Sequence, residues 1–338
     1  MNCRIQRLLV VRRGALGDLI LSLPFLIALK QLHPQADLEV LGPAHLWSIV
    51  AGATGWLSRI HELEAFNLSG LYTSGGKISS ASREFLGSFD EIYYVGVDPE
   101  GIIRSQLGQY GFTHVKFISP FPPVGESVHV SDHLILQLGE HDIPPASLLP
   151  NVLPGKADLL LGEGILKDLH LPPSRPLLAI HPGSGSPRKN WSLDHFAEII
   201  RRCLEHRRAT PIVFLGEVES GEMASWTRNL SRGRFPVLSN LSLSAVTGVL
   251  AHCQLYLGND SGITHLAAAL GVPAIALFGV TDPAVWGPRG ESVVILTPLV
   301  RPGEPADLCG LEVETVWRKV EETLYGIVTG SALGMELG

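Results

Sequence analysis

Short apolar runs alternate with longer amphipathic segments along most of this chain. The first run, Leu8 to Val11, precedes a glycine-containing loop and a segment of helical apolar spacing that ends near Lys30. The same order of strand, loop and helix starts again at residues 177–181. Strands joined by helices in this way lie parallel and cross over right-handed. Further strands are predicted at 38–41, 91–97, 114–118, 211–215, 254–257 and 274–278, and further helices at 101–107, 130–138, 160–170, 193–205, 222–230, 244–251, 262–270 and 313–325.

This pattern predicts an α/β protein with two doubly wound, Rossmann-like domains. A chain of 338 residues is long enough for two domains of about 150 residues each. Ligands of such sheets bind at the carboxyl ends of the strands, so the two domains are expected to face each other across an interdomain cleft. The expected parts are a first domain at 1–150, a connection at 151–174, a second domain at 175–311, a last helix at 312–326 and a tail at 327–338.

Composition narrows the classes of function. The net charge of −7 argues against broad binding of a nucleic-acid backbone, although a local basic pocket can still hold one nucleotide. The four cysteines lie far apart without a CxxC pair, which indicates neither a zinc knuckle nor a disulfide framework. No signal-peptide pattern and no uncharged apolar span of about 20 residues is present. We therefore expect a cytoplasmic protein without a transmembrane helix.

The most informative stretch in the second half is the strand end, polar turn and helix start at residues 257–273. Asp260 and Ser261 can cap the helix, and Gly262 lets a ligand approach the backbone. Free N–H groups and the positive dipole end of the first turn favour a phosphate there. His265 follows on the same turn, where it faces either a ligand or the core. An ordinary capped helix is the alternative interpretation of this segment.

A second candidate anion site lies in the loop at residues 181–191. Ser184, Ser186 and neighbouring glycines allow close approach to an oxyanion, and Arg188 or Lys189 supplies a positive charge. The loop has neither the Gly-Lys-Ser/Thr of a P-loop nor the G-x-G-x-x-G of a dinucleotide site, which disfavours a dehydrogenase. A solvated loop is the alternative.

In the first half, Asp18 occupies the matching position after the first strand. A carboxylate at such a turn is often only a helix cap. Opposite a phosphate site, however, it can act as a general base that deprotonates an attacking hydroxyl. The pair His129 and His133 has zinc-ligand spacing, but no third ligand is evident, so no metal site is expected.

Together these segments resemble glycosyltransferase family 9, the ADP-heptose:lipopolysaccharide heptosyltransferases. The resemblance rests on the loop at 12–24, the segment at 181–191 and the motif from Gly258 to His265. Residues 97–105, the helix from His129 to Gly139 and the segment 278–288 follow in the same order as in the family. Ser261 stands at a position where several members of the family have threonine. Residues 66–89 match no family landmark.

The resemblance implies a GT-B fold, with the acceptor on the first domain, the nucleotide sugar on the second and the last helix crossing back to the first. It implies inverting, metal-independent transfer without a cofactor, in which ADP-heptose is the donor substrate and Asp18 the general base. Gly17 and Arg104 fall on the acceptor side. The implied donor-binding residues are Ser184, Ser186, Lys189, Glu222, Leu241, Asp260, Ser261, Gly262 and His265.

The leading hypothesis is therefore a transferase of a heptose-like sugar from an ADP-linked donor to a lipopolysaccharide-core or related glycan acceptor. Its partners would be the donor and a lipid-linked or core oligosaccharide, with no nucleic acid, at the inner face of the cytoplasmic membrane. Two alternatives stay open. One is transfer of another nucleotide sugar or transfer onto a protein, and the other is a nucleotide-sugar-binding protein without catalysis.

Overall fold

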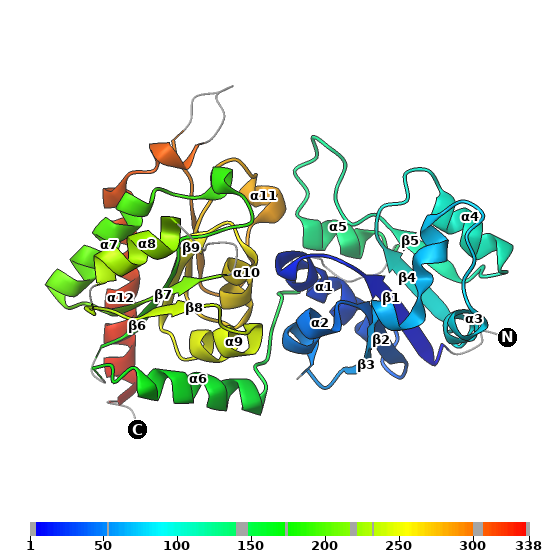
Figure 1. Ribbon diagram of the computed structural model, residues 1–338, viewed down its shortest axis with the longest axis horizontal. Coiled ribbons are helices and arrows are strands. Elements are labelled where there is room, and N and C mark those ends of the chain that lie inside the picture. Colours follow the sequence, from blue (N-terminus) through cyan, green and yellow to red (C-terminus); the bar gives the residue numbers. More distant parts are fainter. Residues whose placement is uncertain are drawn as a thin grey trace. The chain divides into compact units, whose positions relative to one another are not determined.

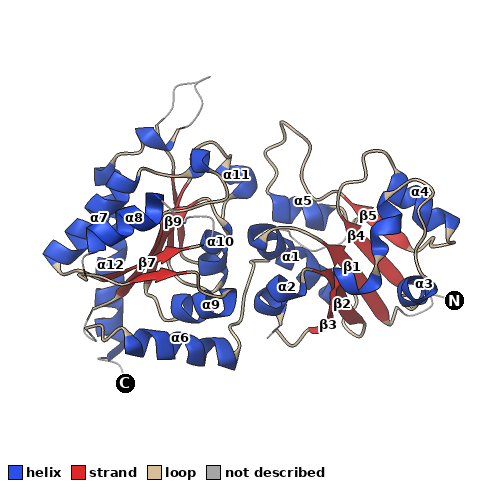
Figure 2. Ribbon diagram, in the orientation of Figure 1, coloured by secondary structure: helices blue, strands red, loops and turns tan. Residues whose placement is uncertain are grey.

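The computed structural model describes residues 5–52, 54–139, 148–172, 175–216, 222–231, 233–299 and 307–335, without the side chains of Glu222, Ala224 and residues 327–335. Two compact units divide the chain, Met1–Leu153 and Pro154–Gly338. Each is a parallel β-sheet with helices on both faces (Figures 1 and 2). The expected cleft between them and the return of the last helix to the first unit stay predictions.

The sheet of the first unit has the strand order β3-β2-β1-β4-β5. Its central strand is apolar between Arg7 and Arg12, and Leu8, Leu9 and Val10 are completely buried, because helices cover the strand from both sides. The order reverses between β1 and β4, which pair in parallel. The strands are β1 (Arg7–Arg12), β2 (Asp37–Gly42), β3 (Leu57–Glu62), β4 (Glu91–Val95) and β5 (Val115–Ile118).

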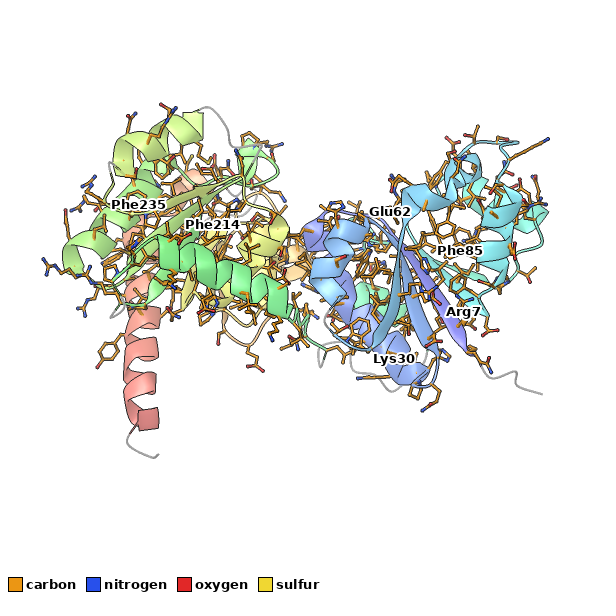
Figure 3. The ribbon with its side chains drawn as sticks, turned by 60° about the horizontal axis from the view of Figure 1, so that its bottom comes forward. Arg7, Lys30, Glu62, Phe85, Phe214 and Phe235 are labelled. Atoms are coloured by element: carbon orange, nitrogen blue, oxygen red, sulfur yellow. The ribbon has the colours of Figure 1, made fainter. Side chains whose placement is uncertain are left out.

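Helices α1, α2 and α5 pack together on one face of this sheet, and α3 and α4 lie on the other (Figure 1). Arg7 and Phe85 lie within this unit (Figure 3). Arg7 Nη2 donates to Glu39 Oε1 at 2.7 Å and joins β1 to β2. The helices are α1 (Leu16–Leu32), α2 (Ala44–Ala51), η1 (Leu63–Phe66), η2 (Leu68–Tyr72), α3 (Ser80–Gly87), α4 (Ile102–Gln109) and α5 (Val130–Leu136).

The sheet of the second unit has the order β11-β10-β9-β6-β7-β8. If β6 is counted as strand 1, the order from β8 to β11 is 3-2-1-4-5-6, which is the Rossmann order. The order reverses between β6 and β9, which also pair in parallel. The strands are β6 (Leu177–His181), β7 (Thr210–Leu215), β8 (Val237–Ser239), β9 (Leu255–Asn259), β10 (Ala274–Leu277) and β11 (Val293–Leu296).

Helices again cover both faces of this second sheet. One core contains side chains of α7 and α12 together with Phe235, which lies in this unit with Phe214 (Figure 3). On the other side α6 packs closely on α9, where a Cβ on Gly248 would lie 1.9 Å from the Asp158 carbonyl oxygen. The helices are α6 (Lys156–Asp168), η4 (Pro187–Lys189), α7 (Leu193–His206), α8 (Glu222–Ser231), α9 (Leu243–Ala251), α10 (Gly262–Ala269), α11 (Pro283–Trp286), η6 (Leu308–Gly310) and α12 (Val313–Met335).

All of the predicted strands and helices are confirmed, with small shifts at their ends. The predictions omitted the edge strands β3, β8 and β11 and the short helices α2, α3 and α11. Helix α12 continues to Met335, past residue 326 where the last helix was expected to end, since no proline interrupts the segment. Among the described residues, no helix combines the length and apolarity needed to cross a bilayer.

Candidate active site

The loops after β6 and β9 leave the second sheet at neighbouring points where its strand order reverses. His181 ends β6 and is paired in register with Gly258 of β9. Ligands of open parallel sheets bind beyond the strand ends at this position. The predicted anion loop at 181–191 and the predicted helix start at Ser261 therefore belong to one edge of the same sheet.

Asn259 holds the two loops together. Its side chain is fully buried, accepts a hydrogen bond from Trp191 N at 3.0 Å and donates from Nδ2 to Pro182 O at 2.7 Å. Trp191 is in turn anchored by its Nε1, which donates to Leu311 O at 2.9 Å. A buried amide with both ends satisfied fixes the position of the loop that carries the basic residue. Sequence reasoning gave Asn259 no role, although a polar residue at the end of a buried strand was the available signal.

Lys189 and Asp260 form an ion pair at this edge. Lys189 Nζ lies 2.7 Å from Asp260 Oδ2, and the side chains of Lys189 and Asp260 are 30% and 8% exposed. Thr281 Oγ1 donates to the same carboxylate oxygen at 2.6 Å. Thr281, which the sequence analysis did not select, thus helps to orient a carboxylate that holds the lysine. The Lys189 ammonium group has three N–H donors, so donors remain available for a second anion.

Ser261 is the N-cap residue of α10, as predicted. Its Oγ accepts a hydrogen bond from Thr264 N at 3.4 Å and lies 3.4 Å from His181 Nδ1. The prediction that Asp260 also caps this helix is wrong, because its carboxylate is bound to Lys189 and Thr281 instead. First-turn N–H groups such as that of Gly262 have no acceptor within a helix and can bind a phosphate.

The other predicted donor residues are less uniformly placed. His265 is buried on α10, 6% exposed, so most of its surface is in the core. Ser184 Oγ is within hydrogen-bonding distance of two acceptors of its own loop, Ser186 O at 2.7 Å and Asn190 Oδ1 at 2.6 Å. Leu241 lies half-buried between β8 and α9. Glu222 is the first residue of α8, and its side chain lies outside the described residues.

In the first unit, Asp18 is the third residue of α1, whose N-cap is Ala15. Asp18 Oδ2 accepts a hydrogen bond from Ala15 N at 3.1 Å, so the carboxylate folds back over the loop that follows β1. Gly14 makes this possible, since a Cβ there would lie 2.8 Å from the Asp18 Cβ. The carboxylate therefore supports the helix start, and it also lines a cavity.

This cavity has a volume of about 420 Å³ and lies at the carboxyl ends of β1 and β4, where the strand order of the first sheet reverses. Small-molecule sites commonly have volumes of about 300–1,000 Å³. The cavity combines charged and aromatic side chains. Its lining includes Arg12, Arg13, Asp18, Tyr72, Tyr94 and Phe121.

The electrostatics of the cavity are set by burial and by neighbouring charges. Burial lowers the pKa of the Arg12 guanidinium below its usual value. The charge of the nearby Asp18 carboxylate acts in the opposite direction but is the smaller effect. Burial and the neighbouring Tyr72 raise the pKa of Tyr94, so this phenol stays protonated at neutral pH. A guanidinium remains charged in proteins. The cavity therefore offers two cations, one carboxylate and the neutral phenol of Tyr94.

The predicted acceptor-side residues lie in the same unit but not in the lining of this cavity. Gly17 is buried in the first turn of α1. Arg104 is exposed on α4, and its guanidinium carbon lies 4.1 Å from the centre of the Phe117 ring. His129 caps α5, with Nδ1 accepting from Ser131 N at 3.2 Å. The described residues contain no group of three or more His, Cys, Asp or Glu placed to hold a metal ion.

A family model described as glycosyltransferase family 9 (heptosyltransferase) matches residues 161–303. The resemblance to glycosyltransferase family 9 is confirmed. The "Lipopolysaccharide heptosyltransferase 2" of Salmonella typhimurium is 26% identical over 328 residues, which cover 86% of this chain and 88% of that protein.

Two solved structures resemble the fold of this protein. The glycosyltransferase family 9 protein from Veillonella parvula has a TM-score of 0.77 and 17% identity, covering 96% of this chain and 99% of that one. The E. coli ADP-heptose lipopolysaccharide heptosyltransferase II has a TM-score of 0.71 and 17% identity, with 95% and 99% covered. With the two Rossmann-ordered sheets, these likenesses confirm the predicted GT-B fold.

Proposed function

We propose that this family-9 protein is an inverting glycosyltransferase that moves a heptose-like sugar from an ADP-linked donor to a lipopolysaccharide-core or related glycan. The observation that carries this proposal is the Lys189–Asp260 ion pair beside the start of α10, at the strand-order reversal of the second sheet. An ammonium group and helix N–H groups together suit a diphosphate. The naming of ADP-heptose in a structural neighbour supports the choice of nucleotide.

In this mechanism the acceptor hydroxyl attacks the anomeric carbon of the donor sugar from the side opposite the diphosphate. The bond between that carbon and the diphosphate oxygen breaks, and ADP leaves with the electron pair. Asp18 accepts the proton of the hydroxyl, and Lys189 with the α10 N–H groups stabilises the charge that develops on the leaving diphosphate. No metal and no further cofactor enters this proposal.

Calorimetric titration of the full-length protein with ADP and UDP, followed by a transfer assay with ADP-heptose, tests this function. We expect ADP to bind more tightly than UDP. Bound ADP should also raise the melting temperature of the protein, because a ligand that binds only the folded state stabilises that state. Mass spectrometry should detect a heptose-extended core oligosaccharide. Preference for UDP would contradict the ADP-linked donor, and ADP binding without transfer to any glycan would favour a binding protein.

We further propose that the protein works in the cytoplasm and meets its acceptor at the inner face of the membrane. The acceptor lipid, rather than a segment of this chain, would supply the attachment. Flotation with vesicles that contain lipopolysaccharide should recover more protein than flotation with plain phospholipid vesicles. Equal recovery would contradict this source of attachment.

A further inference from the structure

Three hydroxyl groups form a hydrogen-bonded network beneath the start of α10. Helix α10 packs against β9, the strand that precedes it (Figure 1). The Tyr256 hydroxyl of β9 lies 2.9 Å from Thr264 Oγ1 of α10, and Thr264 Oγ1 lies 3.1 Å from Ser261 Oγ. Tyr256 and Thr264 are completely buried, whereas Ser261 is 9% exposed. The network therefore runs from the interior of the second unit to the helix end where the diphosphate is proposed to bind.

Gly258 gives the Tyr256 hydroxyl the space to reach α10. Residues two apart on a strand lie on the same face, so the Tyr256 ring can extend along β9 over Gly258. A Cβ at position 258 would lie only 2.7 Å from Tyr256 Cζ. Any larger residue there would displace the ring. The pair of Tyr256 and Gly258 therefore directs a phenol hydroxyl towards the carboxyl end of a buried strand.

The hydrogen atoms of this network can be assigned by elimination. Thr264 Oγ1 donates to Asn259 O, because a carbonyl oxygen can only accept. The Thr264 hydroxyl has no second hydrogen, so the Tyr256 hydroxyl donates to it. Ser261 Oγ lies 3.1 Å from Thr264 Oγ1 and 3.4 Å from His181 Nδ1, both longer than the ~2.7–2.8 Å of a typical O–H···O hydrogen bond. A phosphate oxygen at the typical distance would therefore be a better acceptor for the Ser261 hydrogen.

Thr264 also connects the two loops of the candidate site. The Asn259 carbonyl that accepts its hydrogen belongs to the residue whose side chain holds Trp191 N and Pro182 O. Buried polar networks whose members satisfy one another make a site rigid. One buried side chain thus connects the start of α10, the end of β9 and, through Asn259, the loop that carries Lys189.

We propose that Tyr256 is a positioning residue for the donor diphosphate. Through Thr264 it holds Ser261 and the first-turn N–H groups of α10 where the phosphate oxygens arrive. This inference rests on the proposed function, which puts the diphosphate of ADP at α10. Tyr256 is completely buried, so it acts on the ligand only through Thr264. Groups that are held in place before a ligand binds lose less conformational freedom on binding, which raises the affinity for phosphate.

Removal of the Tyr256 hydroxyl tests this role. Tyr256→Phe keeps the ring and deletes one oxygen, and ligand-observed NMR titration of the full-length protein measures the affinities for ADP and adenosine. We expect ADP to bind about threefold to tenfold more weakly, as for the loss of one hydrogen bond. Adenosine, which has no phosphate, should bind as tightly as to the unmodified protein. A loss by the same factor for both ligands would indicate a general loosening of the second unit and overturn the proposal.

Tyr93→Phe is the matched control, because it also removes a hydroxyl from a buried tyrosine. Tyr93 is 3% exposed and its hydroxyl donates to Glu91 Oε2 at 2.9 Å, but it belongs to the first unit. This variant should bind ADP as tightly as the unmodified protein. Equal losses in Tyr93→Phe and Tyr256→Phe would contradict the positioning role.

Variants of Thr264 test the connection itself, and they carry the test if Tyr256→Phe does not fold. Thr264→Val keeps the shape without the hydroxyl and should weaken ADP binding by about tenfold or more. Thr264→Ser restores a hydroxyl and should bind ADP at least about threefold more tightly than Thr264→Val. The double variant Tyr256→Phe/Thr264→Val should match Thr264→Val within about twofold, because Tyr256 acts only through Thr264. Additive losses, or no recovery by serine, would overturn the proposal.

The unmodified protein separates this inference from the proposed function. If it binds ADP no more tightly than adenosine, the diphosphate does not bind at α10, and both proposals fail. If it prefers ADP, and both Tyr256→Phe and Thr264→Val keep the full preference, the donor site stands and only the positioning role is contradicted.

Discussion

The two units reverse their strand order in the same way, yet the polar groups at the two reversal points are in different states. In the second unit, the charges of Lys189 and Asp260 meet, and Asn259 is bonded at both ends. In the first unit, Arg12 has a buried N–H that finds no acceptor within the described part of the chain. The polar groups of the second unit satisfy one another, whereas the buried guanidinium N–H of the first unit has no acceptor among the described residues. The same strand order therefore does not imply that the polar groups at the two reversal points have the same hydrogen-bond partners.

The largest expected effect comes from removing the proton acceptor in the first unit. Asp18→Asn keeps the size of the side chain and an oxygen for Ala15 N. Because general-base catalysis contributes about 10²–10⁴-fold, we expect kcat for glycosyl transfer to fall by about that factor. Steady-state kinetics measure the change, and ADP affinity should stay within about threefold, as for a group that acts on the acceptor. A nearly unchanged kcat would remove Asp18 from the mechanism.

The next effect concerns the completed network of the second unit. Asn259→Ala leaves the buried Trp191 N–H and Pro182 C=O without their partner, which should lower the free energy of unfolding by about 3 kcal/mol. Urea denaturation measures this loss. Asn151→Ala, at an exposed position, is the control and should change stability by less than about 0.5 kcal/mol. A loss of similar size in both variants would mean that the network is unimportant.

A smaller change is expected from the lysine at the same edge. Lys189→Gln removes the cation next to Asp260 and should weaken ADP binding by about tenfold, since one charged hydrogen bond to the diphosphate is lost. Lys156→Gln removes an equal charge from an exposed position on α6 and should leave ADP affinity unchanged. Calorimetric titration compares them. Matching affinities for the two variants would place the diphosphate elsewhere.

The smallest effect is expected at the amino ends of β1 and β4, where one carboxylate oxygen accepts two backbone hydrogen bonds. Asp90 Oδ2 accepts hydrogen bonds from Gln6 N at 2.7 Å and Arg7 N at 2.9 Å. These bonds hold the pKa of Asp90 below its usual value. A carboxyl whose pKa is lowered by folding stabilises the protein above its unfolded pKa of about 3.9, and this stabilisation disappears as the pH falls through the folded pKa.

Asp90→Asn should therefore reduce stability modestly at neutral pH and by a diminishing amount as the pH falls below about 4. Urea denaturation across this range measures the difference from the unmodified protein. Glu84→Gln, an exposed carboxylate of α3, is the matched control. A difference that stays constant across the range would show that the loss comes from packing rather than from titration.

Prediction from the sequence worked best at the centre of each sheet. Strands β1, β6 and β9 are covered on both faces, so their residues form continuous apolar runs that stand out in the sequence. Strand β3 was missed because it lies at an edge, and its sequence LSRIHE contains three ionisable side chains in six residues. An edge strand needs less apolar surface, and its pairing with β2 compensates for its polar composition.

The candidate site was predictable to the extent that its residues are adjacent in sequence. Asp18 lies in the first helical turn after the apolar run Leu8 to Val11, and Asp260 to Gly262 lie in the turn after strand β9 of the second sheet, so local pattern was enough. The partners of Asp260 lie 71 and 21 positions away, at Lys189 and Thr281. No local periodicity reveals such contacts. Arg12 was visible only as a charged residue that ends an apolar strand.

By itself, the sequence determined the alternation of strands and helices, the resemblance to glycosyltransferase family 9 and the places where loops carry charge. These follow from short-range spacing, because a helix or a parallel strand imposes its period on neighbouring residues. Only the tertiary structure decided that Ser261 rather than Asp260 caps α10, and that the Arg12 guanidinium is buried beside a cavity. Hydrogen-bond completion depends on which distant groups packing brings within reach, and spacing along the chain does not encode that distance.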